Sequence, residues 1–168
     1  MDDFVEIVDN NDVKTGNSTT RKEAHQLALP HRIASVFVFS NDHKLFVQVR
    51  KDNGRFDHSV GGHVDVGESY ERAALREMEE ELGITTALNP VKMSIFEDCR
   101  ETGYGPIVHV HGLFQTIAPR EWKFVPNDEV ADLKIMTIDE IDADMKANPD
   151  NYTYGFIKTL AAYVESVQ

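Results

Sequence analysis

Runs of apolar residues, several of them alternating with polar ones, predict a series of strands along the chain. The predicted strands are residues 4–9, 34–40, 44–50, 91–98, 105–117 and 129–137. A short polar segment at 41–43 separates the second strand from the third and predicts a hairpin-like turn. Gly61 and Gly62 interrupt the pattern after this hairpin, and residues 10–20 are rich in turn-forming side chains.

Apolar residues at every third or fourth position predict helices over residues 69–82, 137–147 and 153–167. Ser69 and Thr137 can cap the starts of the first two, and Gly83 can end the first in the left-handed region. Residues 21–32, interrupted by Pro30, are expected to form a loop or a short turn. This order of elements predicts an α/β fold in which a mixed β-sheet is sandwiched between α-helices.

The composition is that of one soluble globular domain spanning residues 1–168. Apolar residues make up 41% of the chain, yet no apolar run approaches the roughly 20 residues that span a bilayer. The acidic N-terminus lacks the apolar segment of a signal peptide, and Cys99 is the only cysteine, so we expect a cytoplasmic protein. The net charge of −12 argues against nucleic acid or an anionic membrane as a partner.

The predicted helix over 69–82 carries two separate groups of side chains. On a helical wheel they are an apolar arc of Leu75, Met78 and Leu82, with Ala74 at its edge, and an acidic arc of Glu77, Glu80 and Glu81. Carboxylates so close repel one another, but they are also the hard oxygen ligands that Mg²⁺ and Mn²⁺ prefer. The alternative is a solvated glutamate-rich face, since glutamate favours helices. The spacing alone leaves both interpretations open.

A longer pattern surrounds these glutamates. Gly62 is followed after five residues by Glu68 and, after seven more, by the run REMEEELGI at 76–84. This resembles the Nudix box, which places a glycine, a glutamate, an Arg-Glu pair, a Glu-Glu pair, a second glycine and an aliphatic residue at these spacings. Every fixed position matches. The order of the flanking strands also resembles the Nudix fold, so the resemblance covers most of the chain.

The resemblance implies a hydrolase that cleaves a pyrophosphate bond in a nucleoside diphosphate linked to another group, with Mg²⁺ or Mn²⁺ as cofactor. It implies as metal ligands Glu77, Glu80, Glu81 and, through its carbonyl oxygen, Gly62. Arg76 would orient the carboxylates by charge-assisted hydrogen bonds. Glu68 would support the loop before the helix or reach a metal through water.

The resemblance does not settle which residue is the general base. A carboxylate must take a proton from the attacking water, and we name Glu80 as the first candidate and Glu77 as the second. In this family the base often lies on a loop outside the box, which adds Glu121 and Glu129. Each of these two residues has an alternative interpretation as an ordinary surface glutamate.

The segments on either side of the box resemble a Nudix branch that also contains isopentenyl-diphosphate isomerases. In those enzymes two histidines before the first core strand and one in a Cys-Gly-His triplet hold a metal, and His25, His31 and His63 stand in roughly those places. They would suit Mn²⁺ or Zn²⁺, or they bond only to backbone and solvent. Gly61 stands where the isomerases have a catalytic cysteine, and the box, usually incomplete in them, is complete here. Both differences favour a hydrolase.

Further candidates lie outside the box. The proposed substrate contacts are Arg50, Arg55, His63 and Glu129. The candidates for stacking on a base, or alternatively for packing, are Phe56, Tyr104 and Trp122. His109 and His111 share one face of their predicted strand and either line the cleft, pack, or face solvent. Cys99 is expected to pack as a small hydrophobe.

Three functions are thus weighed for the sequence. The first is hydrolysis of a nucleoside diphosphate or its derivative, with a small-molecule diphosphate as partner and a homodimer as a common outcome in the family. The second is isomerisation of an isoprenoid diphosphate. The third is a nucleotide-sensing Nudix domain without activity, which the intact set of glutamates argues against.

Overall fold

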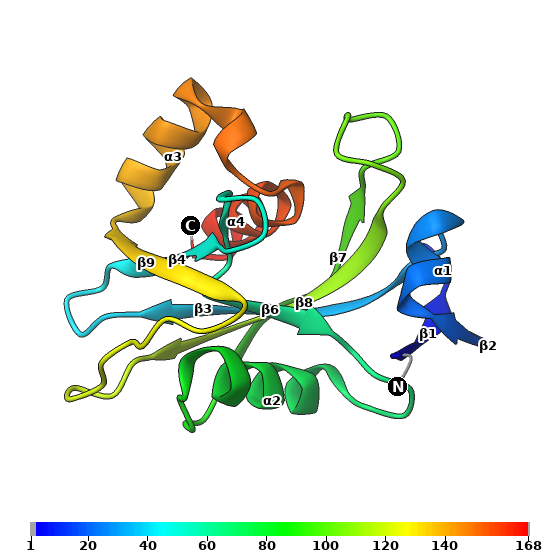
Figure 1. Ribbon diagram of the computed structural model, residues 1–168, viewed down its shortest axis with the longest axis horizontal. Coiled ribbons are helices and arrows are strands. Elements are labelled where there is room, and N and C mark those ends of the chain that lie inside the picture. The colour runs from blue at the N-terminus through cyan, green and yellow to red at the C-terminus, as the bar shows by residue number, and fades with distance from the viewer. Residues whose placement is uncertain (1–2, 168) are drawn as a thin grey trace.

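The computed structural model describes residues 3–167, over which the chain forms nine strands and four α-helices (Figure 1). The strands are β1 Phe4–Val8, β2 Lys14–Thr20, β3 His31–Phe39, β4 Leu45–Arg50, β5 Phe56–Asp57, β6 Val60–His63, β7 Asn89–Asp98, β8 Val108–Ile117 and β9 Val130–Met136. The helices are α1 Arg21–Gln26, α2 Tyr70–Leu82, α3 Ile138–Ala147 and α4 Tyr154–Val167, and a 3-10 turn covers Pro149–Asn151. The strands form the mixed sheet that the sequence predicts.

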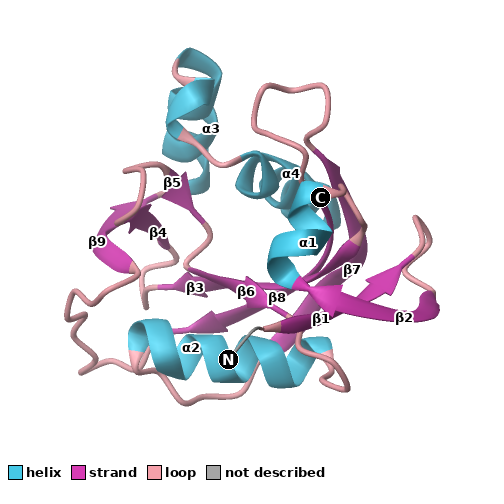
Figure 2. Cartoon of the chain, turned by 45° about the vertical axis from the view of Figure 1, so that its right-hand side comes forward, coloured by secondary structure: helices cyan, strands magenta, loops and turns pink. Residues whose placement is uncertain are grey.

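Strand β3 lies at the centre of this sheet and is buried on both faces. It pairs in parallel with β8 over its whole length, from His31 opposite His109 to Phe39 opposite Ile117. It also pairs antiparallel with β6. Helix α2 covers one face of the sheet, and α3 and α4 cover the other (Figures 1 and 2). Consecutive apolar residues in β3 are therefore needed, because alternate side chains point into two different cores.

The three predicted helices, α2, α3 and α4, begin and end within one residue of the predicted bounds. The Ser69 hydroxyl accepts the N–H of Arg72 at the start of α2, and Gly83 ends that helix with a φ of 63°. Thr137 caps α3, with its hydroxyl accepting the N–H of Glu140. Among the helices within residues 3–167, none combines the length and apolarity needed to cross a membrane.

The buried face of α2 differs slightly from the predicted one. Met78 and Leu82 are buried against β3, as expected. The pattern also predicts Leu75 on this face, but Leu75 is 37% exposed. The helix meets the sheet through Ala73 and Ala74, which are fully buried. That contact places Leu75, one position further along the helix, at the rim.

Two segments near the N-terminus differ from the sequence prediction. Residues 14–20, predicted to be turn-rich, form β2, because pairing with β1 satisfies their backbone groups. Residues 21–26, predicted as a loop or a short turn, form α1, whose N–H at Glu23 is capped by the hydroxyl of Thr20. This helix places His25 beside residues of β3, β6 and β8.

The two adjacent glycines also differ from the prediction, because they lie within β6 rather than interrupting the sheet. Gly61 is opposite Ser35 of β3, and Gly62 is opposite Ala34. A Cβ atom on Gly62 would lie 2.0 Å from the carboxyl carbon of Glu77. Position 62 therefore needs a glycine for α2 to approach β6 with Glu77 in this position.

Candidate functional site

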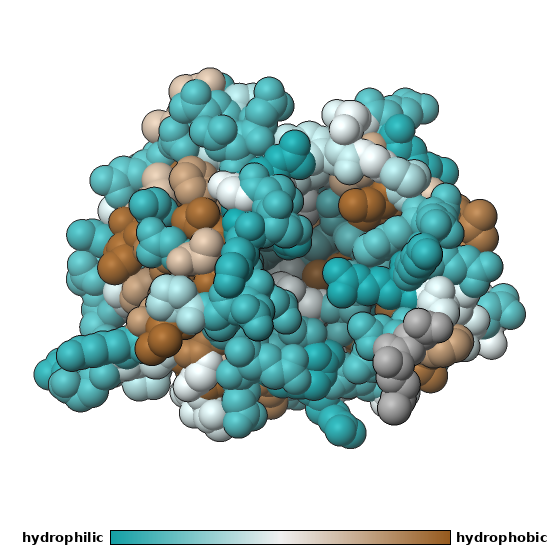
Figure 3. All heavy atoms as spheres, in the orientation of Figure 1, coloured by the Kyte–Doolittle hydropathy of each residue, from teal (hydrophilic) through white to brown (hydrophobic). Residues whose placement is uncertain are grey.

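A cavity of about 700 Å³ opens on one face of the molecule, where Figure 3 shows a hollow with many hydrophilic side chains around it. Helix α2 contributes to its lining Arg76, Glu77, Glu80 and Glu81. Strand β6 contributes Gly61, Gly62 and His63. The volume lies within the range of about 300–1,000 Å³ that is usual for small-molecule sites.

Arg76 holds several acidic groups of this wall in place. Its Nη1 lies 2.6 Å from Oε1 of Glu77 and 3.6 Å from Oε2 of Glu80. Its Nη2 donates to Oε2 of Glu68 and to the carbonyl oxygen of His63, each at 3.0 Å. The hydrogen bond to Glu68 is the main cause that raises the pKa of Arg76 above its ordinary value. One guanidinium thus ties the loop before α2 to the acidic arc.

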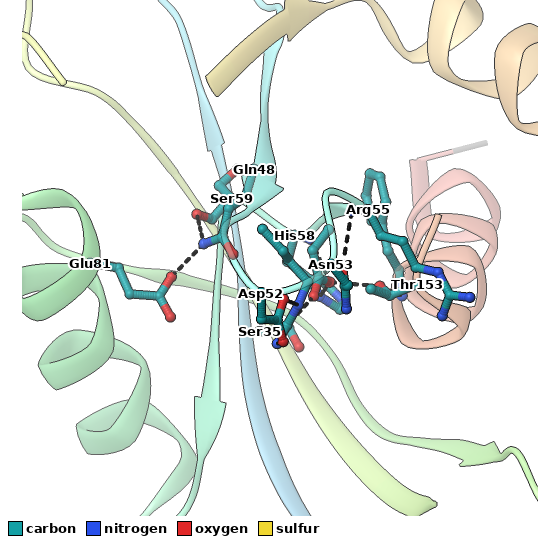
Figure 4. A network of polar contacts seen from close by, with 12 residues as sticks. Ser35, Gln48, Asp52, Asn53, Arg55, His58, Ser59, Glu81 and Thr153 are labelled. Carbon is teal, nitrogen blue, oxygen red and sulfur yellow. Dashed lines mark hydrogen bonds and ion pairs between the residues drawn. The ribbon is translucent and has the colours of Figure 1, made fainter. Parts of the chain in front are cut away.

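The three glutamates of the acidic arc have different surroundings. The Glu80 side chain is 58% exposed, whereas Glu81 is 5% exposed and its Oε2 accepts a 2.7 Å hydrogen bond from Nε2 of Gln48 (Figure 4). Burial raises the pKa of Glu77 above its ordinary value. Burial, together with the charge of Glu77, raises the pKa of Glu81 further. A divalent cation would reverse these shifts by stabilising the ionised carboxylates.

The structure separates the two candidate acids on the loop before β9. Glu129 lines the cavity, whereas Glu121 is exposed and is not part of the lining. Asn127 ties this loop to α2: its Nδ2 donates to the carbonyl oxygen of Glu81 at 2.7 Å, and its Oδ1 accepts the N–H of Glu129 at 3.0 Å. Glu129 is therefore held beside the acidic arc.

Arg50 and Arg55 both line the cavity but have different partners. Arg50 donates to Oδ2 of Asp52 at 2.8 Å and to Oδ2 of Asp57 at 3.1 Å. These two carboxylates already balance its charge. The guanidinium of Arg55 instead lies over the ring of Tyr104, 4.8 Å from the ring centroid. Arg55 is thus the less neutralised of the two.

Four histidines converge beside another part of the cavity, and three of them, His25, His63 and His109, line it. Their ligand-capable nitrogens all lie within 4.8 Å of one another, and the residues are His25, His31, His63 and His109. Nε2 of His25 is 3.2 Å from Nε2 of His63 and 3.2 Å from Nε2 of His109. Nε2 of His31 is buried without a hydrogen-bond partner. A buried imidazole nitrogen without a partner is costly unless a ligand occupies it.

Burial and the neighbouring imidazoles keep these histidines uncharged. They lower the pKa of His25 to about 4 and that of His31 to about 3. Burial, the charge of Arg21 and the neighbouring imidazoles lower the pKa of His63 well below its ordinary value. Neutral imidazole is the form that binds a metal. We name this group, His25, His31, His63 and His109, the histidine cluster.

Hydrogen bonds from outside the histidine cluster orient two of its rings. Nδ1 of His31 donates to the carbonyl oxygen of Leu29 at 2.8 Å, and Nδ1 of His109 donates to Oε2 of Glu97 at 2.9 Å. Each bond leaves the Nε2 lone pair directed at the cluster, as in metal-ligating histidines. Burial opposes ionisation of Glu97, but hydrogen bonds from His109 and His111 outweigh it and hold the pKa of Glu97 far below its ordinary value.

Strand register explains why the rings meet. His109 is opposite His31 across β8 and β3, and His63 is opposite Ile33, two positions after His31 on the same face. Glu97 of β7 is opposite His109 on its other side. Gly62 faces the other side of the sheet, toward α2. Neighbouring positions in β6 therefore contribute to the histidine cluster, through His63, and to the surroundings of the acidic arc, through Gly62.

The sequence reasoning missed two of these contacts. The pattern leaves open whether His109 lines the cleft, packs in the core or faces solvent, and it does not single out Glu97. Both are less than 10% exposed. The available signal was that Val108 and Val110 surround His109 with apolar residues, which is typical of a strand buried on both faces, where a polar side chain needs a partner. Cys99 is buried as expected, and its Sγ also donates to Oε1 of Glu97 at 3.1 Å.

The histidine cluster is more compact than the acidic arc. Among residues 3–167, the sets whose ligand atoms all lie within 4.8 Å of one another are the histidine cluster and the trio of Glu97, His109 and His111. The carboxylates of the acidic arc do not form such a set. Those carboxylates need further oxygen ligands from elsewhere to surround a cation.

The sheet, the box on α2 and the cavity beside it define a Nudix-type α/β protein. Residues 29–155 match the family model of the NUDIX domain, and the chain belongs to the Nudix family. It is 34% identical over 151 residues to an isopentenyl-diphosphate Delta-isomerase of Dinoroseobacter shibae, with 86% of this chain and 85% of that protein aligned. It is 38% identical over 94 residues to an uncharacterized Nudix hydrolase of Streptomyces coelicolor, covering 53% of this chain and 51% of that protein.

Solved structures agree on the fold. A MutT NUDIX hydrolase from Burkholderia pseudomallei superposes with a TM-score of 0.61 at 24% identity, covering 83% of this chain and 98% of the other. The NUDIX domain of Shewanella oneidensis NrtR, in complex with ADP ribose, superposes with a TM-score of 0.60 at 16% identity, covering 82% and 88%. At these identities the likeness confirms the expected Nudix fold and nothing finer.

Proposed function

We propose that this protein is a metal-dependent Nudix hydrolase that cleaves the pyrophosphate bond of a nucleoside diphosphate or its derivative. The observation that carries the proposal is that Glu77, Glu80 and Glu81 line one cavity while Arg76 orients the first two. A domain that only senses nucleotides has no need of this complete acidic arc.

The donors at α2 fit a hard divalent cation such as Mg²⁺ or Mn²⁺. They are carboxylate oxygens, to which the resemblance to the Nudix box adds the carbonyl oxygen of Gly62, and the Glu77 carboxylate occupies the space that a side chain at position 62 would fill. Phosphate oxygens of the substrate would supply the remaining ligands, as is usual for Mg²⁺. When bound, the cation neutralises phosphoryl charge and lowers the pKa of water.

The chain's own residues would then position and deprotonate the water. The water oxygen attacks phosphorus, its proton passes to a carboxylate, and the P–O bond of the anhydride breaks to leave two phosphate products. Glu80, the exposed member of the acidic arc, remains our first candidate for the base, and Glu77 the second. Glu129, held beside the arc by Asn127, is the candidate outside the box.

The histidine cluster supports a second cation site in the same cavity. Four imidazole nitrogens suit a borderline cation such as Zn²⁺ or Mn²⁺ better than Mg²⁺. The unpartnered Nε2 of buried His31 is the observation that favours an occupant. The resemblance to isomerases suggests His25, His31 and His63 for such a site, and the geometry adds His109.

The second candidate function is isomerisation of an isoprenoid diphosphate. It is favoured by the histidine cluster and by the length over which the Dinoroseobacter relative aligns. Against it, Gly61 supplies no thiol at the position of the isomerase cysteine. Cys99 is a poor substitute for that catalytic thiol, because burial raises the pKa of Cys99 and its Sγ donates a hydrogen bond to Glu97. Incubation with isopentenyl diphosphate and Mg²⁺ separates the two: an allylic product without phosphate release would establish the isomerase.

The decisive experiment is a phosphate-release assay on nucleoside diphosphates, triphosphates, sugar nucleotides, dinucleotides and coenzyme A, with Mg²⁺ and with Mn²⁺. Glu80→Gln should lower kcat by about 100-fold or more, without changing the melting temperature, since Glu80 is exposed. Glu79→Gln is the matched control, because Glu79 is exposed on the same helix and does not line the cavity. If Glu80→Gln left phosphate release unchanged for every substrate of the wild-type protein, metal-dependent catalysis at this arc would be excluded.

A further inference from the structure

Three side chains from separate segments lie next to one another in the lining of the cavity. They are Arg55, just before β5, Tyr104 in the loop between β7 and β8, and Tyr154 at the start of α4. All three are half-buried. The Arg55 guanidinium lies 4.8 Å from the centroid of Tyr104, and the Tyr104 and Tyr154 centroids are 5.6 Å apart with a tilt of 33°. We name this group the Arg55 recess.

The lack of an ion pair within the described residues distinguishes Arg55 from two neighbouring arginines of the same cavity. Arg50 and Arg76 each form ion pairs with at least two carboxylates. Within residues 3–167, Arg55 forms no ion pair and rests on an aromatic ring instead. A guanidinium stacked on one ring can accept a second planar group on its opposite face, because its own plane is delocalised and weakly hydrated.

The recess is held in shape without a ligand. The Tyr104 hydroxyl donates to the carbonyl oxygen of Pro149 at 3.3 Å. The N–H of Arg55 donates to Oδ1 of Asn53 at 2.9 Å, and the N–H of Thr153 donates to the carbonyl oxygen of Phe56 at 2.9 Å. Thr153 directly precedes Tyr154, so this last bond ties the recess to β5. Preorganised stacking groups lose little conformational freedom when a ligand binds.

The recess lies away from the acidic arc. Figure 4 shows Glu81 at one side of a polar network and Arg55 at the other, with Gln48 and His58 between them. A ligand whose diphosphate lies against α2 would therefore reach the recess with its other end. Because this inference places the two ends of one substrate, it rests on the proposed function.

We propose that the Arg55 recess binds the planar ring of the substrate, remote from its pyrophosphate. An isoprenoid chain fits poorly, since it would cover the guanidinium without offering it a partner. A second phosphate would compete with the Tyr104 ring for Arg55 and would lie near the carboxylates of Asp52 and Asp57. A nucleobase avoids both problems, because its uncharged face stacks on guanidinium and aromatic planes.

Calorimetric binding of AMP and of ribose 5-phosphate tests this proposal without requiring hydrolysis. The two probes carry the same phosphate and sugar, and they differ in the planar base. Wild-type protein should bind AMP about tenfold more tightly than ribose 5-phosphate. Arg55→Ala and Tyr104→Ala should each remove most of that difference, whereas Tyr104→Phe, which keeps the ring, should preserve it. Arg120→Ala is the control for an exposed arginine outside the cavity.

Each result decides the proposal. Equal affinity of the wild-type protein for the two probes would overturn it, and so would an Arg55→Ala variant that weakens both probes equally, since that pattern indicates a phosphate contact. A cooperative thermal transition in each variant would verify that it is folded, because most single substitutions lower stability by only about 0.5–3 kcal/mol. Hydrolysis and the effect of Glu80→Gln are measured separately, so the proposed function stands or fails independently.

Discussion

Glu97 lies opposite His109 across strands β7 and β8, and its Oε2 accepts a 2.9 Å hydrogen bond from Nδ1 of His109. The bond fixes the tautomer of His109, so that Nε2 faces the histidine cluster. The same oxygen accepts a 2.7 Å bond from Nε2 of His111. A buried carboxylate thus sets the direction of a ring that would bind a cation.

Replacing Glu97 should therefore weaken the cation site without removing any of its four rings. Glu97→Gln is expected to lower the affinity for Zn²⁺ or Mn²⁺ by about 10- to 100-fold, because an amide orients the ring less strongly than a carboxylate. Isothermal titration with each metal measures the effect. Glu101→Gln, an exposed acid four residues further along, should bind like the wild type. Equal affinities of Glu97→Gln and the wild type would contradict an orienting role.

The two glycines of β6 offer a matched pair of substitutions. Gly62→Ala should displace the Glu77 carboxylate, whose carbon lies 2.0 Å from the position of the added Cβ. We expect kcat to fall by about 100-fold and the Mg²⁺ concentration for half-maximal activity to rise. Gly61→Ala would meet only Nδ1 of His58, at an ordinary 3.6 Å, and should retain activity. Similar losses in both variants would show that crowding of Glu77 is not the cause.

Met78 is buried on α2 and Leu75 is partly exposed, so substitutions at these two positions should have unequal effects on stability. Met78 is fully buried between the helix and β3, so Met78→Ala should lower the free energy of unfolding by about 2–5 kcal/mol. Leu75 lies at the rim, and Leu75→Ala should cost less than about 1 kcal/mol. Urea unfolding measures both. If Leu75→Ala lowered the free energy of unfolding as much as Met78→Ala does, Leu75 would have to be part of the core.

The lowered pKa of Asp57 predicts how the free energy of unfolding depends on pH. Burial opposes its ionisation, but the hydrogen bond and charge of His58 and the charge of Arg50 outweigh burial and hold the pKa of Asp57 well below its ordinary value. The folded state then binds fewer protons than the unfolded one. The resulting stabilisation is fully present above the unfolded pKa, about 4, and is lost as the pH falls through the folded pKa.

Asp57→Asn removes this titration. The variant should be less stable than wild type at pH 7, and its free energy of unfolding should fall less steeply than that of wild type between about pH 5 and pH 3. Urea unfolding at several pH values measures the two slopes. Asp132→Asn, at an exposed carboxylate, serves as control. Parallel curves for Asp57→Asn and wild type would show that Asp57 does not cause the acid sensitivity.

Local patterns predicted much of the fold because they act over a few residues. Ser69 and Gly83 delimit α2 through contacts within one helical turn, and the apolar run of β3 predicts a central strand. Residues 14–20 were misjudged because turn propensity was overridden by pairing with β1. Leu75 was misjudged because a wheel gives the arc of a helix but not its rotation against the sheet.

The sequence by itself determined the acidic arc, since residues three and four positions apart on a helix must lie over one another whatever surrounds them. Only the tertiary structure decided that the histidine cluster forms. His25 and His109 are 84 positions apart, yet their Nε2 atoms lie 3.2 Å from each other. That proximity depends on the docking of α1 and the parallel pairing of β3 with β8, which are set by burial of apolar surface over the whole chain rather than by any local spacing.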